Sequence, residues 1–534
     1  MCTILTVNIP CSISDIHFKD KKTPPSVSKH LKSFLPCFRI NKTTIKQVQI
    51  MSNPQPQEFR RSLTLLDGTM LVSGTMIGSG IFIVSADMSR TVGSAGWLIF
   101  LWLLTGVMNV FGAISYGELA GMMPRAGGQF VYIKRAWGDL TAFLYGWSVA
   151  AVIQTGTIAA VAMAFAKYTS FFMPSLGESH ILMQIGSFKL NAAQLLAISS
   201  IIFLTYVNSR GINYGKIIQL VFTMSKLVAL AILIILGFIV GSKSGFFTTN
   251  FTDAWAATQT VKTSTGAWVT ENIAGMGLVL ALGTAIIGSL FSSDAWNNVT
   301  FIAGEMKNPR RDIPLSLFFG TAIVTILYIA ANLAYLALLP MKGDPNGADV
   351  VARGIMFAQS DRVGTAAGFQ IFGGIAAALM SALIMVSTFG CNSGLILSGA
   401  RVYYAMSKED LFFKKASELN NAGVPEFSLW IQCLWASVLC LSGTYGDLLE
   451  YATFVSLIYY CITIAGIFIL RKKEPDAERP YKVPGYPITP LIYILLALII
   501  CLILLYTKTS STGMGLLIIA VGIPVYYLFK KNKV

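Results

Sequence analysis

The chain has 534 residues, of which 54% are hydrophobic and only 12% are charged, and its mean hydropathy is +0.65. No ordinary soluble globular protein of this length has such a composition, so we predict a polytopic membrane protein. The formal net charge of +15 comes from basic residues dispersed among the predicted loops, with no basic stretch interleaved with aromatic residues, which argues against a nucleic-acid partner.

The N-terminal residues 1–62 are rich in Lys, Ser, Pro and Thr and contain no apolar core of the signal-peptide type. We expect a disordered cytoplasmic tail, with the first span serving as the insertion signal and Met51 as an alternative start. Apolar runs that can cross a bilayer, about 20 residues each, then recur as far as residue 529. We interpret twelve of them as spans. If both termini are cytoplasmic, most of the 40 Lys and Arg residues fall on the cytoplasmic side, and we predict a multi-pass protein of the plasma membrane.

The first predicted span, about residues 65–88, is interrupted at its midpoint by Gly78, Ser79 and Gly80. Glycine costs roughly 1 kcal/mol relative to alanine inside a helix, and in hydrocarbon every backbone N–H and C=O released by a break needs a partner. The bare amides at the start of the second half-helix, near Gly80, lie at the positive end of its dipole and suit a carboxylate. The sequence therefore predicts a binding site at this break.

Four further spans complete the first half of the chain. They are predicted at residues 96–122, 140–172, 192–207 and 214–240, with an amphipathic segment at 130–137 on the cytoplasmic face and polar external loops after the third and fifth spans.

One of these spans, the fifth, carries a Lys residue near its middle, Lys226. Its side chain either snorkels to the cytoplasmic interface or is a buried ammonium that takes the place of a coupling cation, and the sequence leaves both interpretations open.

The sixth span, about residues 271–302, repeats the interruption of the first, since residues 287–296 are small and polar at bilayer depth. Asp294 lies at this second break. It is either a helix cap alone or also a site group that holds a substrate amino group or takes up a proton, and we favour the site role. Phe291 is a candidate gate over bound substrate. Ser292 and Ser293 line the site or bond back to helix carbonyls, and Asn297 faces either the bundle or the cavity.

The second half of the chain reproduces the helix count of the first. An odd number of spans per repeat inserts the two halves in opposite orientations, and interrupted spans at matching places indicate a central transport site. The charged, proline-containing residues 305–314 are a candidate cytoplasmic gate. We assign repeat 1 to residues 63–241, repeat 2 to 271–471 and the last two spans to 488–529, with the later spans at 314–339, 364–406, 428–442, 447–470, 488–506 and 513–529.

Other chemistries find no support in the sequence. The three His residues are scattered, and neither a phosphate-binding loop nor a nucleophile motif is present, so we predict no metal, no cofactor and no enzyme activity. The eight Cys residues lie in the tail or in predicted spans, and we expect no disulfide.

Three segments together resemble the amino acid–polyamine–organocation (APC) superfamily, and within it the L-type amino acid transporter branch and its bacterial relatives. They are residues 78–82 (GSGIF), residues 116–128 (from YGEL to PRAGG) and residues 291–310 (from FSSDAWN to EMKNPR). The resemblance implies an all-α fold of twelve transmembrane helices of the LeuT type, with two inverted repeats of five helices, two extra C-terminal helices, and breaks in helices 1 and 6.

The resemblance also implies an amino-acid substrate whose carboxylate meets amides at Ser79 and Gly80 and whose amino group meets carbonyls at Ile77, Phe291 and Asp294. Lys226 matches a Lys that takes the place of a sodium site, which argues against sodium coupling. The substrate-binding residues implied are Ile77, Gly78, Ser79, Gly80, Ile81, Phe291, Ser292, Ser293 and Asp294.

The chain departs from this branch in two places. Residues 293–295 (SDA) replace small, Gly-rich residues, so the amino-group pocket is predicted to be more acidic than usual. Heteromeric members carry a Cys between helices 3 and 4, whereas residues 173–190 contain none, so no disulfide-linked ancillary subunit is expected.

We therefore predict a sodium-independent secondary transporter of amino acids, neutral ones above all, working by exchange or proton coupling. A permease for cationic amino acids or polyamines, with Asp294 as the added acidic contact, is one alternative. A transporter-like sensor that binds an amino acid is another.

Overall fold

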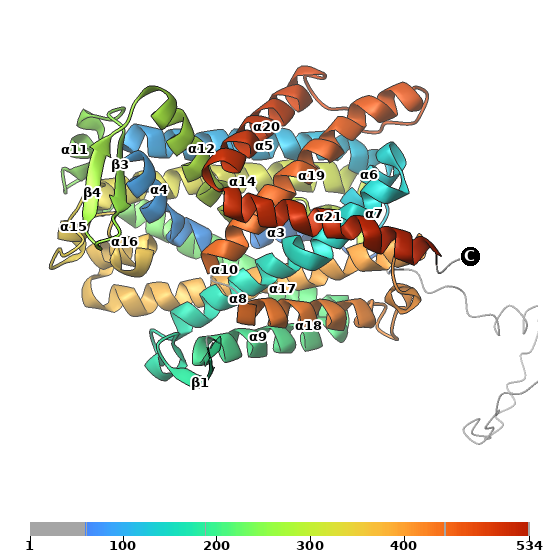
Figure 1. Cartoon of the computed structure of the whole chain (residues 1–534), viewed down its shortest axis with the longest axis horizontal. Coiled ribbons are helices and arrows are strands. Elements are labelled where there is room, and N and C mark those ends of the chain that lie inside the picture. The colour runs from blue at the N-terminus through green and yellow to red at the C-terminus, as the bar shows by residue number, and fades with distance from the viewer. Residues whose placement is uncertain (1–58, 60, 187, 443–444, 532–534) are drawn as a thin grey trace, which may run out of the picture. The chain divides into compact units, whose positions relative to one another are not determined.

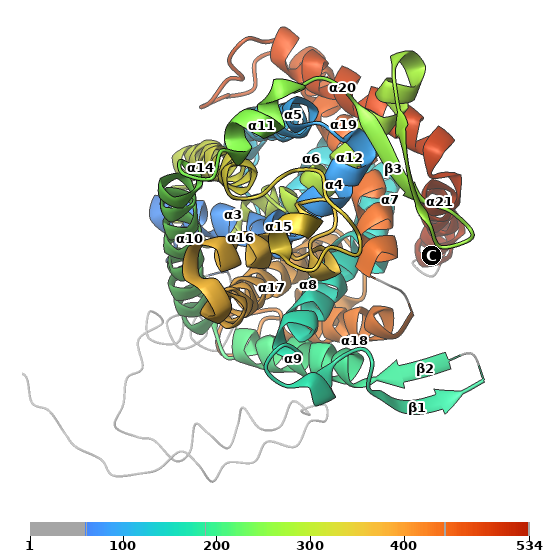
Figure 2. The ribbon, with the colours of Figure 1, turned by 90° about the vertical axis from the view of Figure 1, so that its left-hand side faces the viewer.

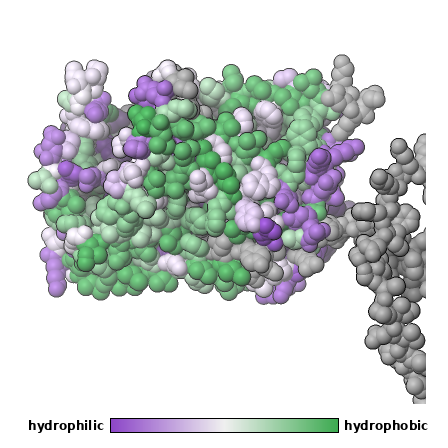
Figure 3. Space-filling model, turned by 90° about the horizontal axis from the view of Figure 1, so that it is seen from below, coloured by the Kyte–Doolittle hydropathy of each residue, from purple (hydrophilic) through white to green (hydrophobic). Residues whose placement is uncertain are grey.

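The computed structural model describes residues 59, 61–186, 188–442 and 445–531, and the predicted tail up to residue 58 lies outside them. In the described part of the chain, ten helices are long and apolar enough to cross a membrane, by length and composition only. Figure 3 shows an apolar middle zone on one face of the molecule, between two ends where hydrophilic residues gather. The prediction of a polytopic helical membrane protein is confirmed.

The first helices follow the predicted order. A capping box holds the start of the first one, because the Thr64 hydroxyl accepts from the amide of Asp67 and the Thr64 amide donates to the Asp67 carboxylate. At the start of the helix Ala95–Met122, the Ser94 hydroxyl accepts from the amide of Trp97 as a simple N-cap. The elements are α3 (Leu65–Met76), η2 (Gly80–Phe82), α4 (Val84–Val92), α5 (Ala95–Met122) and α6 (Gln129–Trp137).

The third predicted span contains a π-helical turn that the sequence does not reveal. It consists of α7 (Asp139–Ser148), the π turn η3 (Val149–Ile153) and α8 (Gln154–Thr169). After it come η4 (Pro174–Leu176), the hairpin β1 (Ile181–Ile185) with β2 (Phe188–Asn191), α9 (Ala192–Ser209) and α10 (Ile212–Gly241).

The predicted loop at 241–270 also has structure of its own. It contains α11 (Phe246–Thr252) and the antiparallel hairpin β3 (Thr258–Lys262) with β4 (Trp268–Asn272), in which Thr260 faces Thr270 and their hydroxyls lie 2.9 Å apart. The sixth predicted span was therefore wrong at its start: Glu271 belongs to β4, and the helix begins at Gly275. A hairpin needs only local pairing, which a hydropathy pattern does not detect.

The second half continues with the elements that lead into and out of the second break. They are α12 (Gly275–Ser292), α13 (Asn298–Phe301), η5 (Ala303–Glu305), α14 (Pro309–Leu338), α15 (Val350–Arg353), η6 (Gln359–Asp361), α16 (Val363–Phe372), η7 (Gly373–Ile375), α17 (Ala376–Lys408), η8 (Lys414–Ser417), α18 (Glu426–Ser442), α19 (Tyr445–Lys473), α20 (Ile488–Thr507) and α21 (Thr509–Lys531).

Two of these elements correct predicted boundaries. The eighth span, predicted as one helix over residues 364–406, divides at Gly373, whose φ of +65° ends α16 before α17 begins. The seventh helix starts five residues earlier than predicted because Pro309 at its first turn is compatible with a helix N-terminus.

The interrupted helices lie inside the bundle. The helix α14 packs against both α3 and α5, and α17 packs against α8 and α10. Figure 2 looks onto the end of the molecule that carries β3, α4, α11, α15 and α16, and it shows α4 and α12 between α14 and α21. The breaks are therefore enclosed by neighbouring helices.

Candidate functional site

The first break is present where the sequence predicts it. The helix α3 ends at Met76, Ile77 has an extended backbone, and a short 3₁₀ turn at Gly80–Phe82 precedes α4. Glycine is required at position 80 because the first break lies very close to Ser292 at the end of α12. An added Cβ would lie 2.1 Å from the Ser292 hydroxyl and 2.9 Å from the Ser292 backbone. At Gly78 an added Cβ would meet only the Cys391 sulfur, at 3.6 Å.

The second break also matches its predicted position. The helix α12 ends at Ser292, Ala295 adopts a left-handed φ of +65°, and α13 is only four residues long. A positive φ at a residue with a Cβ is uncommon and persists only when surrounding contacts impose it.

The two breaks meet, and one tyrosine joins them. The Thr75 hydroxyl donates to the Ala295 carbonyl at 3.1 Å, and the Tyr328 hydroxyl lies 3.0 Å from both the Met76 and the Ser292 carbonyls. These carbonyls lie where the helical hydrogen-bond ladders stop, so they need the two hydroxyl groups as hydrogen-bond donors. Tyr328, in α14, was not predicted, and no pattern in the seventh span distinguishes it from a packing residue.

Lys226 supplies the charge at this junction. Its ammonium, 3% exposed, donates to the carbonyls of Gly74 at 2.5 Å, Ile77 at 2.6 Å and Ser387 at 3.5 Å. It forms no salt bridge within the described part of the chain. The carbonyl of Ile77 also accepts from the Ser387 hydroxyl at 3.1 Å. A fixed cation thus lies among backbone oxygens at the end of α3.

A polar network surrounds the second break. The Tyr460 hydroxyl donates to the Asp294 carboxylate at 2.5 Å and lies 3.3 Å from the Asn297 amide oxygen. Asn297 donates to Gln129 at 2.8 Å, which in turn donates to Thr463 at 3.0 Å. The Ser293 carbonyl accepts from Asn109 at 3.2 Å. Neutral groups therefore surround the Asp294 carboxylate.

Two small cavities flank the junction, each of about 20 Å³. Each has room for about one water molecule. The first is bounded by both breaks and the second by the polar network, and Asp294 and Ala295 line both. The first is also lined by Gly78, Ser79, Gly80, Phe291 and Ser292, which are predicted site residues, and the second by Gln129, Gln154, Asn297, Tyr459 and Tyr460. Ile77 and Ser293 are predicted site residues that line neither, and Ile81 is buried in the core.

A larger polar chamber of about 230 Å³ lies between α4 and the second half of α12. Its lining includes Arg90 paired with Asp361 at 2.7 Å, and Lys508 paired with Glu450 at 2.8 Å. Gly288 lies at its inner wall, one turn before Ser292.

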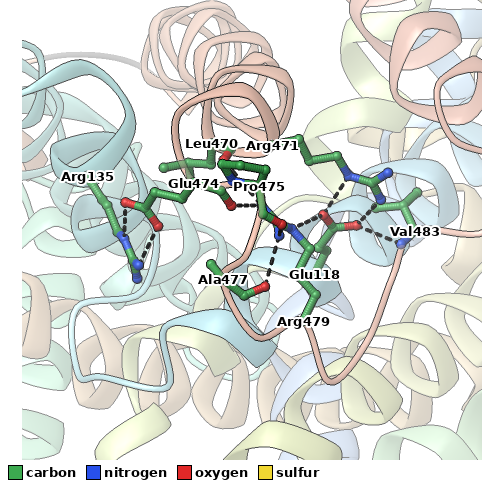
Figure 4. Close-up of polar contacts among 9 residues, drawn as sticks. All are labelled: Glu118, Arg135, Leu470, Arg471, Glu474, Pro475, Ala477, Arg479 and Val483. Carbon is green, nitrogen blue, oxygen red and sulfur yellow. Dashed lines mark hydrogen bonds and ion pairs between the residues drawn. The ribbon is translucent and has the colours of Figure 1, made fainter.

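A buried carboxylate, Glu118, lies near the opposite end of the molecule (Figure 4). Both oxygens of Glu118, 1% exposed, accept from Arg471 at 2.9 and 2.6 Å, and one also accepts from the amide of Val483 at 2.8 Å. Arg479 approaches the same carboxylate at 3.5 Å, and Arg135 pairs with Glu474 nearby. These contacts join α5 and α6 to α19 and the segment after it.

The packing of Gly117 against Tyr481 accounts for the glycine that precedes Glu118 in the YGEL motif. Gly117 lies under Tyr481, whose ring would be 2.9 Å from an added Cβ. Partial burial, and then the charge of Glu118, raises the pKa of the Tyr481 phenol, so the ring stays neutral there.

A second buried ion pair lies on the predicted gate segment. Glu305 and Arg401 are 2% and 0% exposed in their side chains and lie 2.8 Å apart. The Glu305 carbonyl accepts from the amides of Ser62 and Leu63, which ties the residues before α3 to this segment. Gly128, with φ of +41°, lets the chain before α6 approach α13, where an added Cβ would be 2.1 Å from the Thr300 hydroxyl.

Comparison with known proteins covers nearly all of the chain. The family model described as amino acid permease matches residues 63–528. The serine/threonine exchanger SteT of Bacillus subtilis is 29% identical over 478 residues, which is 89% of this chain and 98% of that protein. The mouse large neutral amino acids transporter small subunit 2 is 27% identical over 88% of this chain and 81% of its own length. The human cystine/glutamate transporter is 28% identical over 88% of this chain and 86% of its own length.

Proposed function

Because the chain belongs to the amino acid permease family, it is a multi-pass membrane transporter and not an enzyme, and we propose that it exchanges neutral amino acids across the membrane. The observation that carries the proposal is the meeting of two broken helices around a buried ammonium. Breaks expose backbone groups of both signs at one place, and the zwitterionic part of an amino acid needs both. Relatives named as exchangers and transporters support the same chemistry.

We assign the substrate carboxylate to the amides at Ser79 and Gly80, at the start of the second half-helix of the first break. The amino group is assigned to the carbonyls of Phe291 and Asp294, with the Ile77 carbonyl as a further acceptor. In the described structure that carbonyl already accepts from Lys226 and Ser387. Substrate binding at Ile77 therefore needs Lys226 or Ser387 to release it. Phe291 covers the small cavity as a gate.

Lys226 supports sodium independence. A sodium ion prefers oxygen ligands, as hard cations do. Here the oxygens of Gly74, Ile77 and Ser387 already surround an ammonium. The ammonium thus supplies the positive charge that a bound sodium would supply.

Alternating access follows from the asymmetry between the two ends. The polar chamber of about 230 Å³ leads to the breaks from one end, whereas Glu118 with Arg471 and Glu305 with Arg401 close the other. Cavities of about 20 Å³ hold no amino acid, so α4 or α12 must move for substrate to bind. Opening the closed end requires the buried ion pairs to separate.

The proposed topology has twelve spans, with repeats at 63–241 and 271–471, two further spans within 488–529, and both termini cytoplasmic. It adds the interrupted pair α3 and α4 and the 17-residue α18 to the ten long helices. We place the protein in the plasma membrane without a disulfide-linked partner, since residues 173–190 contain no Cys and the five described cysteines are buried. On a non-reducing gel it then migrates as it does after reduction.

A second candidate function rests on Asp294. Its carboxylate is bonded to neutral Tyr460, with no cation paired to it in the described residues. A half-buried carboxylate without a counter-charge is unfavourable, and a cationic amino acid or a polyamine would supply that charge.

The test is uptake of a panel of labelled amino acids into proteoliposomes, with and without internal amino acid and with and without an inward proton gradient. If the protein is an exchanger, neutral amino acids enter only vesicles that were preloaded with amino acid. This uptake should not change when sodium is replaced by another cation. Uptake driven by the proton gradient into empty vesicles indicates proton coupling instead. Preference for lysine or putrescine establishes the second candidate, and no uptake of any amino acid refutes the proposal.

A further inference from the structure

The carbonyl oxygens of the second break are held by side chains from three different helices. The hydrogen-bond ladder of α12 ends at residue 292, so the four carbonyls of residues 292–295 need donors from elsewhere. Three of them have such donors: the Ser292 carbonyl lies 3.0 Å from the Tyr328 hydroxyl, the Ser293 carbonyl accepts from the Asn109 amide at 3.2 Å, and the Ala295 carbonyl accepts from the Thr75 hydroxyl at 3.1 Å.

Of these four carbonyls, that of Asp294 has no hydrogen-bond partner among the described residues. The Phe291 carbonyl, which is also assigned to the substrate, already accepts from the Asp294 amide at 3.1 Å. Asp294 lines both of the small cavities. Its carbonyl is therefore the acceptor that the second break keeps for a ligand, and under the proposed function that ligand group is the substrate ammonium.

The direction of the Asp294 carbonyl is set by the bonds on either side of it. A peptide group is planar, so a hydrogen bond to its carbonyl also orients the amide of the next residue. The bonds to the Ser293 and Ala295 carbonyls hold the two peptide groups that flank the one carrying the Asp294 carbonyl. The left-handed φ of +65° at Ala295 fixes the backbone angle next to it.

Asn109 reaches the break from one face of α5, which lies beside α12 and α14 (Figure 1). Four residues earlier, the Thr105 hydroxyl lies 2.7 Å from that of Ser289. Three residues later, Gly112 lies under the Trp296 ring, which would be 3.0 Å from an added Cβ. Residues three and four apart share a helix face, so contacts on both sides hold Asn109 at the depth of the break.

The Asn109 side chain is 4% exposed and lines neither small cavity, so it does not bind a substrate there. We propose that Asn109 is a positioning residue for the substrate ammonium, an inference that rests on the proposed function. By holding the Ser293 carbonyl, it turns the next carbonyl, that of Asp294, toward the amino group. Its amide donates this bond without adding a positive charge that would repel the ammonium.

The test compares two unlabelled competitors of leucine exchange in proteoliposomes, L-leucine and N-methyl-L-leucine. The methyl group replaces one of the three hydrogens of the ammonium, so in the unsubstituted protein the N-methyl compound should bind about tenfold more weakly. Asn109→Leu keeps a similar size but has no donor. It should raise the inhibition constant of leucine about tenfold and reduce the N-methyl penalty to about twofold or less, because the turned carbonyl no longer distinguishes the two compounds.

The matched control is Thr105→Val, which removes the neighbouring buried hydrogen bond between α5 and α12 and leaves the carbonyls of the break bonded. It should keep the N-methyl penalty of the unsubstituted protein. A loss of packing or stability acts on both competitors alike, so only a change in their ratio reports positioning. The same N-methyl penalty in Asn109→Leu as in the unsubstituted protein overturns the role of Asn109.

A second variant gives a result even if Asn109→Leu does not fold. Tyr328→Phe removes only the hydroxyl that bonds the Ser292 carbonyl, on the peptide group before that of Ser293, and it should reduce the N-methyl penalty in the same direction. Tyr335→Phe, on the same helix, removes a hydroxyl with no partner in the described part of the chain and should leave the penalty unchanged.

The possible failures are distinguishable. If no neutral amino acid is exchanged by the unsubstituted protein, the proposed function is refuted and the positioning role with it. If exchange is normal but neither Asn109→Leu nor Tyr328→Phe changes the N-methyl penalty, the positioning role alone is overturned.

Discussion

At the scale of single residues, two glycines in the first break differ in what they do. Both weaken a helix, which the sequence alone shows. Only Gly80 lies against the second break, where Ser292 leaves no room for a Cβ, while the space beside Gly78 is open to 3.6 Å. The motif thus contains one glycine needed for close approach and one that only relaxes the backbone.

We expect Gly80→Ala to reduce exchange at least tenfold, since the new methyl group pushes the two breaks apart. Gly78→Ala should keep exchange within about threefold, because its Cβ makes ordinary contacts. Gly277→Ala in α12, where an added Cβ meets nothing within 4 Å, is the control for expression. Exchange in proteoliposomes, normalised to reconstituted protein, measures the difference. Equal activity of the Gly80 and Gly78 variants would contradict this account.

Asp294 separates the two candidate substrates. In Asp294→Asn the amide oxygen can still accept from Tyr460, so the local geometry is kept while the charge is removed. If substrates are neutral, exchange should stay within about fivefold. If they are cationic, lysine or putrescine transport should fall at least a hundredfold, since a close charge pair in a dry site contributes several kcal/mol. The two cases are distinguished by the competition of unlabelled lysine against labelled serine or leucine, measured in the unsubstituted protein and in Asp294→Asn.

Lys226 is expected to be essential for folding as well as for transport. Lys226→Met leaves the Gly74 carbonyl without its donor, and an unsatisfied buried acceptor costs about 1–3 kcal/mol. We expect a clearly lower melting temperature and loss of exchange at pH 6 and at pH 8. Lys216→Met, a lysine at the start of the same helix, is the control. A Lys226→Met protein that exchanges normally would exclude the fixed-cation role.

At the scale of elements, the ion pairs at the closed end differ in burial and therefore in how much each contributes to stability. The Glu118 side chain is 1% exposed and its partner Arg471 is 25% exposed, whereas Arg310 and Glu478 are 57% and 71% exposed. Surface pairs contribute about 0–1 kcal/mol. Breaking a buried pair from one side costs more, up to about 3–5 kcal/mol when both charges are desolvated.

Glu118→Gln should therefore loosen the contact between α5 and the segment after α19. We expect a cysteine placed at Val483, which is buried, to react faster with a thiol reagent in this variant, because the Val483 amide no longer has a charged acceptor at Glu118. Arg471→Gln should do the same, and the double variant should add little to either single one, since both remove one interaction. Glu478→Gln is the matched surface control. Fully additive effects would show that the two residues act independently.

At the scale of the whole molecule, the apolar middle zone predicts which ends lie on opposite sides of a membrane (Figure 3). The first residue of β3, Thr258, lies against Gly93 just before α5, and Tyr481 in the loop after α19 lies against Gly117 near the end of α5. Since α5 is 28 residues long, these two regions are separated by the thickness of a bilayer.

Single cysteines at Thr265 and at Glu478 should then react with a membrane-impermeant reagent from opposite sides of sealed vesicles. Both positions are exposed, and the background cysteines at 2, 11 and 37 are replaced by serine, while the five others are buried. Thr265 should react from the outside of right-side-out vesicles and Glu478 only after permeabilisation. Labelling of both from one side would refute the proposed topology.

The sequence by itself determined the membrane class, nearly all helix positions, both breaks, and the placing of one ammonium and one carboxylate in otherwise apolar spans. These are local properties, because hydropathy, glycine content and a charge in hydrocarbon are fixed by neighbours along the chain. The hairpins, the π turn η3 and the division at Gly373 were missed, since each depends on short-range pairing or on a single backbone angle inside a pattern that still reads as apolar helix.

Only the tertiary structure decided what each of these groups contacts. Lys226 bonds a carbonyl 149 positions away, and Arg471 bonds a carboxylate 353 positions away. Tyr328, Ser387 and Tyr460 complete the site from three further helices and carry no mark in the sequence. A broken helix creates unsatisfied backbone groups whatever the fold, but the partners that satisfy them are set by the angle and depth at which the surrounding helices pack.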